Sequence, residues 1–289
     1  MNFRELVTEV GPDVKNIKVG DRVTKTKLLL QHVDIVRCVQ ARIIIFVVID
    51  RVLEHRLTDQ WRNMLYREKK VFMYYRIMFR YYQHTLTEPL ACGVHAVIEK
   101  GNVQPGDICV VIWSGSNWTD GCTGCKGCGA TVIMAGLTND AERFKIAKEC
   151  GIDVTVDQMT QDLKSIVMEM TNNEGADKCF ECSGAVVAAN TALDLCRRKG
   201  TVVQMGVFSK SKVEICTDWI LHKEINYVGS RSQKPSSWVK ALELMADGKV
   251  VPEKTAKNFV TLENWRDGFD RMAKGEGAKW VITIDEELE

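Results

Sequence analysis

Three cysteines near the middle of the chain have the spacing of metal ligands. Cys122, Cys125 and Cys128 follow one another at intervals of three residues. A C-x2-C pair is a common zinc-binding pattern, because thiolates are good ligands for Zn²⁺. A structural zinc site needs four ligands, however, and no fourth ligand is evident beside this trio. A cysteine-cluster metal protein therefore stays an alternative and not the main interpretation.

A second group of candidate residues follows a series of short apolar segments. Gly136 ends "ATVIMAG", and the other members lie in "ECSG" (Glu181 to Gly184), "MGV" (Met205 to Val207) and "GSR" (Gly229 to Arg231). Glycine allows a tight turn or a close approach of the backbone to a ligand. Taken singly, Gly184 and Gly206 fit an ordinary turn as well as they fit a binding site.

The segments that must position these residues alternate between strand and helix patterns. Apolar strand patterns alternate with helical ones, and Gly151 and Gly200 follow two of the predicted helices as stop signals. This alternation predicts an α/β fold with a doubly wound parallel sheet of the Rossmann type, in which ligands bind beyond the carboxyl ends of the strands. The predicted strands are 108–112, 130–136, 153–157, 178–184, 201–208 and 224–230, and the predicted helices are 140–150, 160–173 and 188–198.

Composition narrows the class of protein. The chain has 289 residues and a net charge of +1, so no basic surface for nucleic acid is expected. Apolar runs such as "ARIIIFVVID" reach about half the length that spans a bilayer. Eleven scattered cysteines and the lack of a signal-peptide pattern after Met1 predict a reducing, cytoplasmic setting.

Many motifs of the chain resemble those of the zinc-dependent medium-chain dehydrogenases, and the sorbitol and threonine dehydrogenase branch is the most similar. The resemblance covers residues 7–24, 85–112 and 129–289, and its motifs keep the order and spacing of the family. They are "EVGPDVKNIKVGDRV", "TEPLACGVHAV", "QPGD", "ATVIMAG", "AERFKIAKECGID", "GADKCFECSG", "GTVVQMGVF", "ILHKEINYVGS" and "WVKALELMADGKVVPEK".

The resemblance implies a domain plan and an activity. Residues 1–90 would be a truncated, partly displaced catalytic domain with a small β-rich, chaperonin-10-like fold. Residues 91–232 would be the Rossmann nucleotide-binding domain, and residues 233–289 would return to the catalytic domain. The family members are zinc-dependent, NAD- or NADP-linked alcohol or polyol dehydrogenases, in which zinc acts as a Lewis acid on a substrate hydroxyl and a hydride passes to nicotinamide. The implied partners are a small-molecule alcohol or polyol and further copies of the chain in a dimer or tetramer, with no nucleic acid and no membrane.

Cofactor contacts follow from the same resemblance. Arg143 matches an arginine near the adenosine ribose. The predicted strand before it ends in Gly136, at a position where an acidic residue would favour NAD. The choice between NAD and NADP therefore stays open. Glu88 matches a glutamate beside the catalytic zinc, but its cysteine and histidine partners are missing, so no catalytic residue is expected to be intact. His95 is expected to pack in a helix and not to bind metal. The remaining expected cofactor contacts are Cys182, Ser183, Gly184, Met205, Gly206, Val207, Gly229, Ser230 and Arg231.

Three motifs of the family are absent from the chain: the zinc-binding GHE, the four-cysteine zinc lobe and the glycine-rich nucleotide loop. A back-translation shifted by one nucleotide permits "GPGPIGLM" within residues 113–128, a G-x-G-x-x-G pattern directly after a strand. The same shift permits cysteines at C-x2-C-x2-C-x7-C spacing within residues 32–47, and "HEFSG" at the start of the chain. We therefore hypothesise that segments of the chain are read in a displaced frame.

Two hypotheses follow for the function. In the first, the chain is a dehydrogenase whose activity is impaired by the altered segments. In the second, it is a non-catalytic relic of such an enzyme. Residues 25–84, including Arg62, Arg67, Lys69 and Lys70, show no consistent apolar face, so poor packing is expected there.

Overall fold

The computed structural model describes residues 4–6, 19, 22–24, 73–74, 86–112, 118–261, 263–274 and 276–283. The chain forms two compact units, residues 1–88 with residue 289, and residues 89–288. In the first unit, the strands β1 (Arg4–Leu6), β2 (Arg22–Thr24) and β3 (Met73–Tyr74) form an antiparallel sheet in that order. The packing expected for residues 25–84 lies, apart from β3, outside the described residues. The predicted three-part domain plan remains a prediction.

The second unit is built on a six-stranded sheet whose strands are all parallel. The order of the strands is β6-β5-β4-β7-β8-β9, which is the order of a Rossmann fold. The predicted doubly wound α/β fold is therefore confirmed. The strands are β4 (Ile108–Ile112), β5 (Thr131–Gly136), β6 (Val154–Asp157), β7 (Ala176–Glu181), β8 (Cys196–Gln204) and β9 (Asn226–Gly229).

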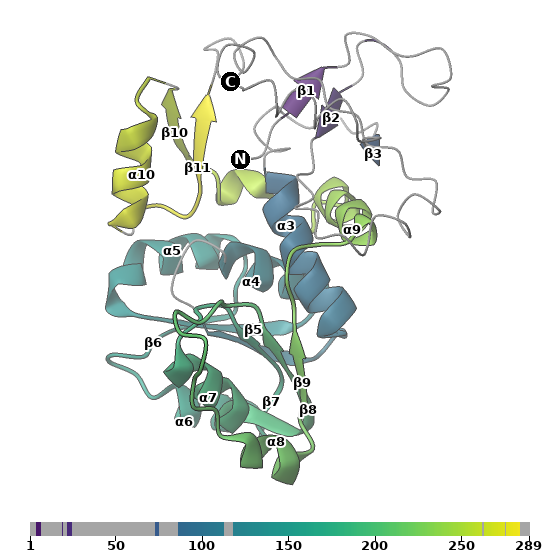
Figure 1. The fold of residues 1–289 in the computed structure, drawn as a ribbon, viewed down its shortest axis with the longest axis vertical. Coiled ribbons are helices and arrows are strands. Elements are labelled where there is room, and N and C mark those ends of the chain that lie inside the picture. The colour runs from purple at the N-terminus through teal and green to yellow at the C-terminus, as the bar shows by residue number, and fades with distance from the viewer. Residues whose placement is uncertain are drawn as a thin grey trace. The chain divides into compact units, whose positions relative to one another are not determined.

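Helices cover both faces of this sheet (Figure 1). On one face lie α4 (Trp118–Gly127) and α5 (Ala141–Glu149), and on the other lie α6 (Leu163–Met170), α7 (Val186–Leu195) and α8 (Thr217–Lys223). The helix α3 (Thr87–Val94) and the π-helix η3 (His95–Lys100) precede β4, and the short 3-10 helix η4 (Thr138–Asp140) precedes α5. No helix in the described ranges has the length and apolar character needed to cross a membrane.

The C-terminal part of this unit adds a second, smaller sheet. After α9 (Pro235–Ala246) and η5 (Pro252–Lys254), the strands β10 (Asn258–Thr261) and β11 (Trp280–Thr283) pair in parallel. The helix α10 (Trp265–Ala273) connects them, as a parallel pair requires a crossover. The result is a single βαβ motif.

Alternate residues of the central strands supply the two hydrophobic cores. Cys109 and Val111 of β4 belong to the core that packs against α4 and α5, whereas Val110 and Ile112 belong to the core that packs against α6 and α7. Side chains of a strand point to opposite faces in turn, so a strand buried on both faces must be apolar throughout. The continuous run "ICVVI" meets that requirement.

The predicted boundary between α7 and β8 was wrong. The helical pattern extended to Arg198, but α7 ends at Leu195 and β8 begins at Cys196, which pairs with Ala176. The Lys223 ammonium donates to the carbonyl oxygens of Leu193, Asp194 and Cys196 and so satisfies the end of the helix. This cap comes from a distant helix, which a local sequence pattern does not reveal.

Candidate functional site

The carboxyl edge of the six-stranded sheet contains the natural ligand-binding position of this fold. The chain proceeds from β4 toward β5 on one side and from β7 toward β8 on the other, so the topological switch point lies at the carboxyl ends of the adjacent strands β4 and β7. A helix, α4, begins at Trp118, only a short connection after Ile112. Its N-terminus therefore lies at this edge, where backbone N–H groups favour an anion. Residues 113–117, the start of the segment for which a displaced frame is hypothesised, lie outside the described residues.

A buried glutamate organises the turn that follows β7. Glu181 is completely buried, and its carboxylate accepts the N–H of Ser183 at 2.7 Å and the N–H of Gly184 at 2.9 Å. The Ser183 hydroxyl also donates to this carboxylate. A buried carboxylate requires such donors, because an unpaired charge in the interior is strongly unfavourable.

The turns after β7 and β8 touch through two glycines. Gly184 has a φ of +71°, and a Cβ built there would lie 2.3 Å from the carbonyl oxygen of Val207. A Cβ on Gly206 would lie 2.0 Å from the Gly184 nitrogen. Neither glycine can carry a side chain without a backbone shift. The two turns predicted to line a cofactor are therefore in backbone contact. Glycine is required at both positions by this contact, and not only by the formation of a turn.

Gln204 extends this network to the next strand. Its amide nitrogen donates to the Glu181 carboxylate and, at 2.8 Å, to the carbonyl of Gly206, and its oxygen accepts the Tyr227 hydroxyl at 2.9 Å. Burial raises the pKa of Tyr227, and the Glu181 charge adds to the effect. One polar network thus connects the carboxyl ends of β7 and β8 with β9. Glu181 was expected at this edge only as part of "ECSG", and Gln204 and Tyr227 were not expected there from the sequence.

The other predicted contacts lie along the same edge. The Cys182 thiol lies 3.6 Å from the Met205 sulfur, and Val207 is 87% exposed. Ser230 is buried, and its N–H donates to the Gln204 carbonyl at 2.9 Å, whereas Gly229 and Arg231 are exposed. The fold therefore gathers Cys182 to Gly184, Met205 to Val207 and Gly229 to Arg231 at the ends of three adjacent strands.

Arg143 has a different environment from these residues. Its guanidinium is buried, with one nitrogen 3.0 Å from Asp140 and another donating to the Gly277 carbonyl at 3.1 Å. These contacts attach α5 to the loop before β11. A contact between Arg143 and the adenosine ribose remains a prediction.

Asp157 ends β6 and lies beside the carboxyl end of β5. In a Rossmann fold that binds NAD, an acidic residue is expected at the end of this second strand. It is opposite Gly136 in the register of β5 and β6, and it accepts the Thr138 hydroxyl at 2.7 Å. The bond from Thr138 lowers the pKa of Asp157, and the N–H of Met159 contributes to the shift. A carboxylate is therefore present beside the end of β5, although it comes from the neighbouring strand. Asp157 was not among the candidate residues expected from the sequence.

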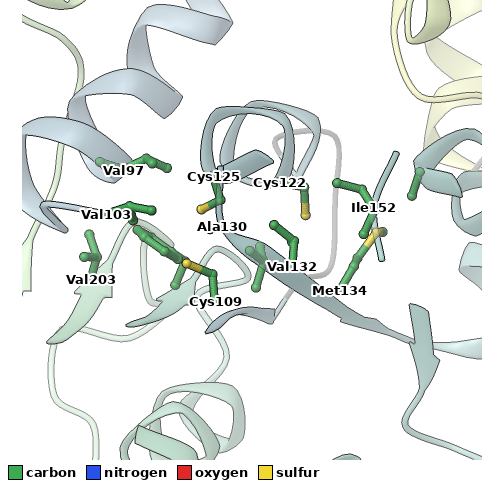
Figure 2. Packing of buried hydrophobic residues seen from close by; sticks show 14 of the residues in the cluster. Val97, Val103, Cys109, Cys122, Cys125, Ala130, Val132, Met134, Ile152 and Val203 are labelled. Atoms are coloured by element: carbon green, nitrogen blue, oxygen red, sulfur yellow. The ribbon is translucent and has the colours of Figure 1, made fainter. Parts of the chain in front are cut away.

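The cysteine trio lies in and beside a hydrophobic core. Cys122 and Cys125 are completely buried among apolar side chains such as Val97, Val132 and Met134, and Cys128 is half-buried (Figure 2). Burial raises the pKa of Cys125 well above its ordinary value, and hydrogen bonding to Cys109 raises it further. Because the thiolate is the form that binds metals, this environment favours packing over ligation.

Glu88 and the histidines are the remaining side chains considered as metal ligands. In the described ranges, no group of three or more His, Cys, Asp and Glu side chains is placed to hold a metal ion. Glu88 lies in the first turn of α3, and His95 is 4% exposed with its Nδ1 atom 2.7 Å from the Glu99 carboxylate. The expectation that His95 is packed in a helix is confirmed. His32, His55 and His84 lie outside the described residues.

Comparison with known proteins identifies the class. Residues 121–247 match the zinc-binding dehydrogenase family. The chain is 34% identical to a D-arabitol-phosphate dehydrogenase of Enterococcus avium over 292 residues, which covers 99% of this chain and 81% of that protein. It is 41% identical to a sorbitol dehydrogenase of Halalkalibacterium halodurans over 198 residues, or 68% of this chain, but this match spans only 57% of that relative.

A solved structure has a similar fold. The structure of 2R,3R-butanediol dehydrogenase from Bacillus subtilis superposes with a TM-score of 0.73 at 22% identity, and the match covers 98% of this chain and 79% of that one. At this identity the likeness concerns the fold alone. Together with the sequence relatives, it completes the assignment: the chain belongs to the zinc-dependent medium-chain alcohol and polyol dehydrogenase family.

Proposed function

We propose that this chain is an NAD(P)-binding oxidoreductase of the polyol dehydrogenase type, which transfers a hydride between a secondary alcohol and nicotinamide, with activity impaired by its altered segments. The observation that carries the proposal is the arrangement of elements at the carboxyl edge of the Rossmann sheet. The N-terminus of α4 lies at the switch point, and the turns after β7 and β8 meet through Gly184 and Gly206. The names of the relatives, D-arabitol-phosphate and sorbitol dehydrogenase, support a polyol as the substrate class.

The residues at this edge fit a dinucleotide in a defined way. The α4 N-terminus would face the pyrophosphate, and residues 182–184 and 205–207 would border the nicotinamide half. When bound, the cofactor supplies the hydride acceptor. The protein's part is to orient the ring against the substrate carbon and to exclude water. Exposed Val207 offers an apolar surface for the ring.

Zinc does not fit the part of the chain that the structure describes, because no trio of suitable ligands is present there. The sequence also lacks the GHE motif and the four-cysteine lobe of the family. We therefore assign no step of the reaction to a metal. These two observations favour a second candidate function, a non-catalytic relic that keeps the nucleotide fold.

Two measurements test the proposal: calorimetric titration of the protein with NADH and with NADPH, and an assay of dinucleotide-linked oxidation of sugar alcohols. We expect saturable binding of at least one dinucleotide and slow, dinucleotide-linked oxidation of sugar alcohols. Binding without any oxidation of sorbitol, arabitol or arabitol phosphate would support the relic. Absence of both binding and turnover at millimolar cofactor would overturn the proposal.

A further inference from the structure

Glu181 is completely buried, yet it lies at the edge where the cofactor is proposed to bind. One carboxylate oxygen, Oε1, accepts the N–H groups of Ser183 and Gly184, and the other, Oε2, accepts from Gln204 and, at 3.1 Å, from Gly184. All of these neighbours are donors. The backbone N–H groups of Ser183 and Gly184 therefore already donate to this carboxylate, and they are not available to bind a phosphate of the cofactor.

The same carboxylate fixes the position of a second turn. Gln204 is oriented by its bond to Glu181, and it holds the Gly206 carbonyl at 2.8 Å. The backbone carbonyl of Glu181 also accepts the N–H groups of Met205 and Gly206, at 2.8 and 2.9 Å. Glu181 thus sets the distance between the turn that carries Cys182 and the turn that carries Met205.

We propose that Glu181 is a positioning residue for the nicotinamide half of the cofactor, acting through Gln204 and the Gly184–Gly206 contact. The inference rests on the proposed dinucleotide binding. Its consequence is selective, because the turns that Glu181 holds border the nicotinamide and not the adenosine. Loss of the carboxylate should weaken binding of the complete cofactor and leave binding of its ADP-ribose portion nearly unchanged.

The variant Glu181→Gln isolates the charge from the shape of the side chain. Because both carboxylate oxygens face donors, either orientation of the glutamine amide places its NH₂ group against another N–H group. We expect roughly tenfold weaker binding of NADH, the effect of losing about one charged hydrogen bond, and less than twofold change for ADP-ribose. A purely structural role would lower both affinities alike or neither.

A matched control lies at the other end of the same strand. Asp177 on β7 also joins strands, accepting the Ile108 N–H at 2.8 Å and the Arg197 guanidinium at 2.6 Å. The variant Asp177→Asn should lower the melting temperature without changing the ratio of NADH to ADP-ribose affinity. A change in that ratio equal to the change in Glu181→Gln would overturn the inference.

A milder variant completes the test. If Glu181→Gln does not fold, Tyr227→Phe removes only the hydroxyl that orients Gln204, and the ratio should fall by roughly twofold to threefold. An unchanged ratio in Tyr227→Phe would overturn the inference. If the unsubstituted chain binds neither NADH nor ADP-ribose, the proposed function itself fails.

Discussion

At the scale of single residues, Glu99 fastens two helices that are far apart in the sequence. Its carboxylate on η3 accepts from the Ser236 and Ser237 hydroxyls of α9 and lies 2.7 Å from His95. Burial alone would raise the pKa of Glu99, but the hydrogen bonds from Ser236, His95 and Ser237 together outweigh it, so the pKa lies below its ordinary value. The ionised form is therefore the one that stabilises the fold.

The variant Glu99→Gln should be less stable than the parent chain at neutral pH, by about 1–2 kcal/mol in the free energy of unfolding, because a charged acceptor becomes neutral. The folded-state pKa is depressed, so the contribution is complete above the unfolded pKa and is lost as the pH falls through the folded pKa. The two unfolding curves should therefore converge as the pH falls below the ordinary glutamate pKa and through the lower folded-state pKa. Urea unfolding across pH 3–7 measures this.

Glu174→Gln is the matched control, because Glu174 is exposed in the connection after α6. It should leave stability within experimental error across the same range. A gap between the parent chain and Glu99→Gln that persisted at pH 3 would contradict the assignment of the effect to the carboxylate charge.

Asp157 gives a prediction for cofactor choice, resting on the proposed function. Its carboxylate is held by Thr138 beside the end of β5, where the adenosine ribose of a dinucleotide would lie, and it would repel a 2′-phosphate. The protein should therefore bind NADH more tightly than NADPH. Asp157→Asn should reduce this preference by roughly threefold to tenfold at low salt and less at high salt, since the group is partly exposed.

Thr138→Val is the companion variant, because it releases the carboxylate without removing its charge. We expect it to change the preference by less than Asp157→Asn does. Equal affinities for NADH and NADPH in the unsubstituted chain would show that Asp157 does not act on the ribose.

At the scale of elements, the strands of the large sheet were predictable and the helix α4 was not. The strands of the large sheet have apolar runs that end at turn residues, and all six occur where the pattern placed them, within a few residues. The segment "WTDGCTGCKG" lacks an apolar helical face, yet it forms α4. Its buried part consists of small residues, with Gly124 against Val97 of η3 and Cys125 in the core. Close packing of small side chains leaves little periodic signal in a sequence.

The contact between the two glycine turns predicts that an alanine substitution at Gly206 destabilises the protein far more than one at Gly229. Gly206→Ala would place a Cβ 2.0 Å from the Gly184 nitrogen, and the turns would have to separate. We expect a loss of about 3 kcal/mol in the free energy of unfolding, measured by urea denaturation, because backbone atoms cannot move as side-chain ends do. NADH affinity should fall as well.

Gly229→Ala is the control for this variant, since a Cβ at Gly229 meets nothing within 4 Å. It lies at the same edge of the sheet and should be nearly neutral in stability. Two alanine variants with equal effects would contradict the close approach of the turns.

At the scale of the whole molecule, the sequence predicted the family and the sheet but not the network that joins the strands. Glu181, Gln204 and Tyr227 lie on three strands, and only the register of these strands reveals that the side chains meet. The missing metal motifs, by contrast, were visible at once, because ligand spacing is a property of the sequence itself. Residues 113–117 and nearly all of residues 25–84 lie outside the described residues, so the displaced-frame hypothesis stays a prediction.

Restoring the altered segments should recover function in two stages. A variant in which residues 113–128 carry a G-x-G-x-x-G loop should bind NADH at least roughly tenfold more tightly than the present chain, because backbone N–H groups can then approach the pyrophosphate. It should still contain much less than one zinc per chain. Metal analysis and calorimetry on the two chains measure this.

Only a chain that also regains the four-cysteine lobe and the GHE motif should oxidise polyols rapidly and lose that activity with a chelator. Stoichiometric zinc in the present chain, or equal NADH affinity before and after loop restoration, would contradict this account.

The order of strands in the large sheet has a consequence for biosynthesis. The strand β4 leaves the ribosome first among the six, yet it ends in the middle of the sheet, between β5 and β7. At roughly 5–20 residues per second, the backbone N–H and C=O groups along one edge of β4 stay unpaired for several seconds until β7 has been translated. An unpaired edge of an apolar strand is a template for pairing with other nascent chains. Yield in a cell should therefore depend on holdase chaperones during that interval, independently of how stable the finished fold is.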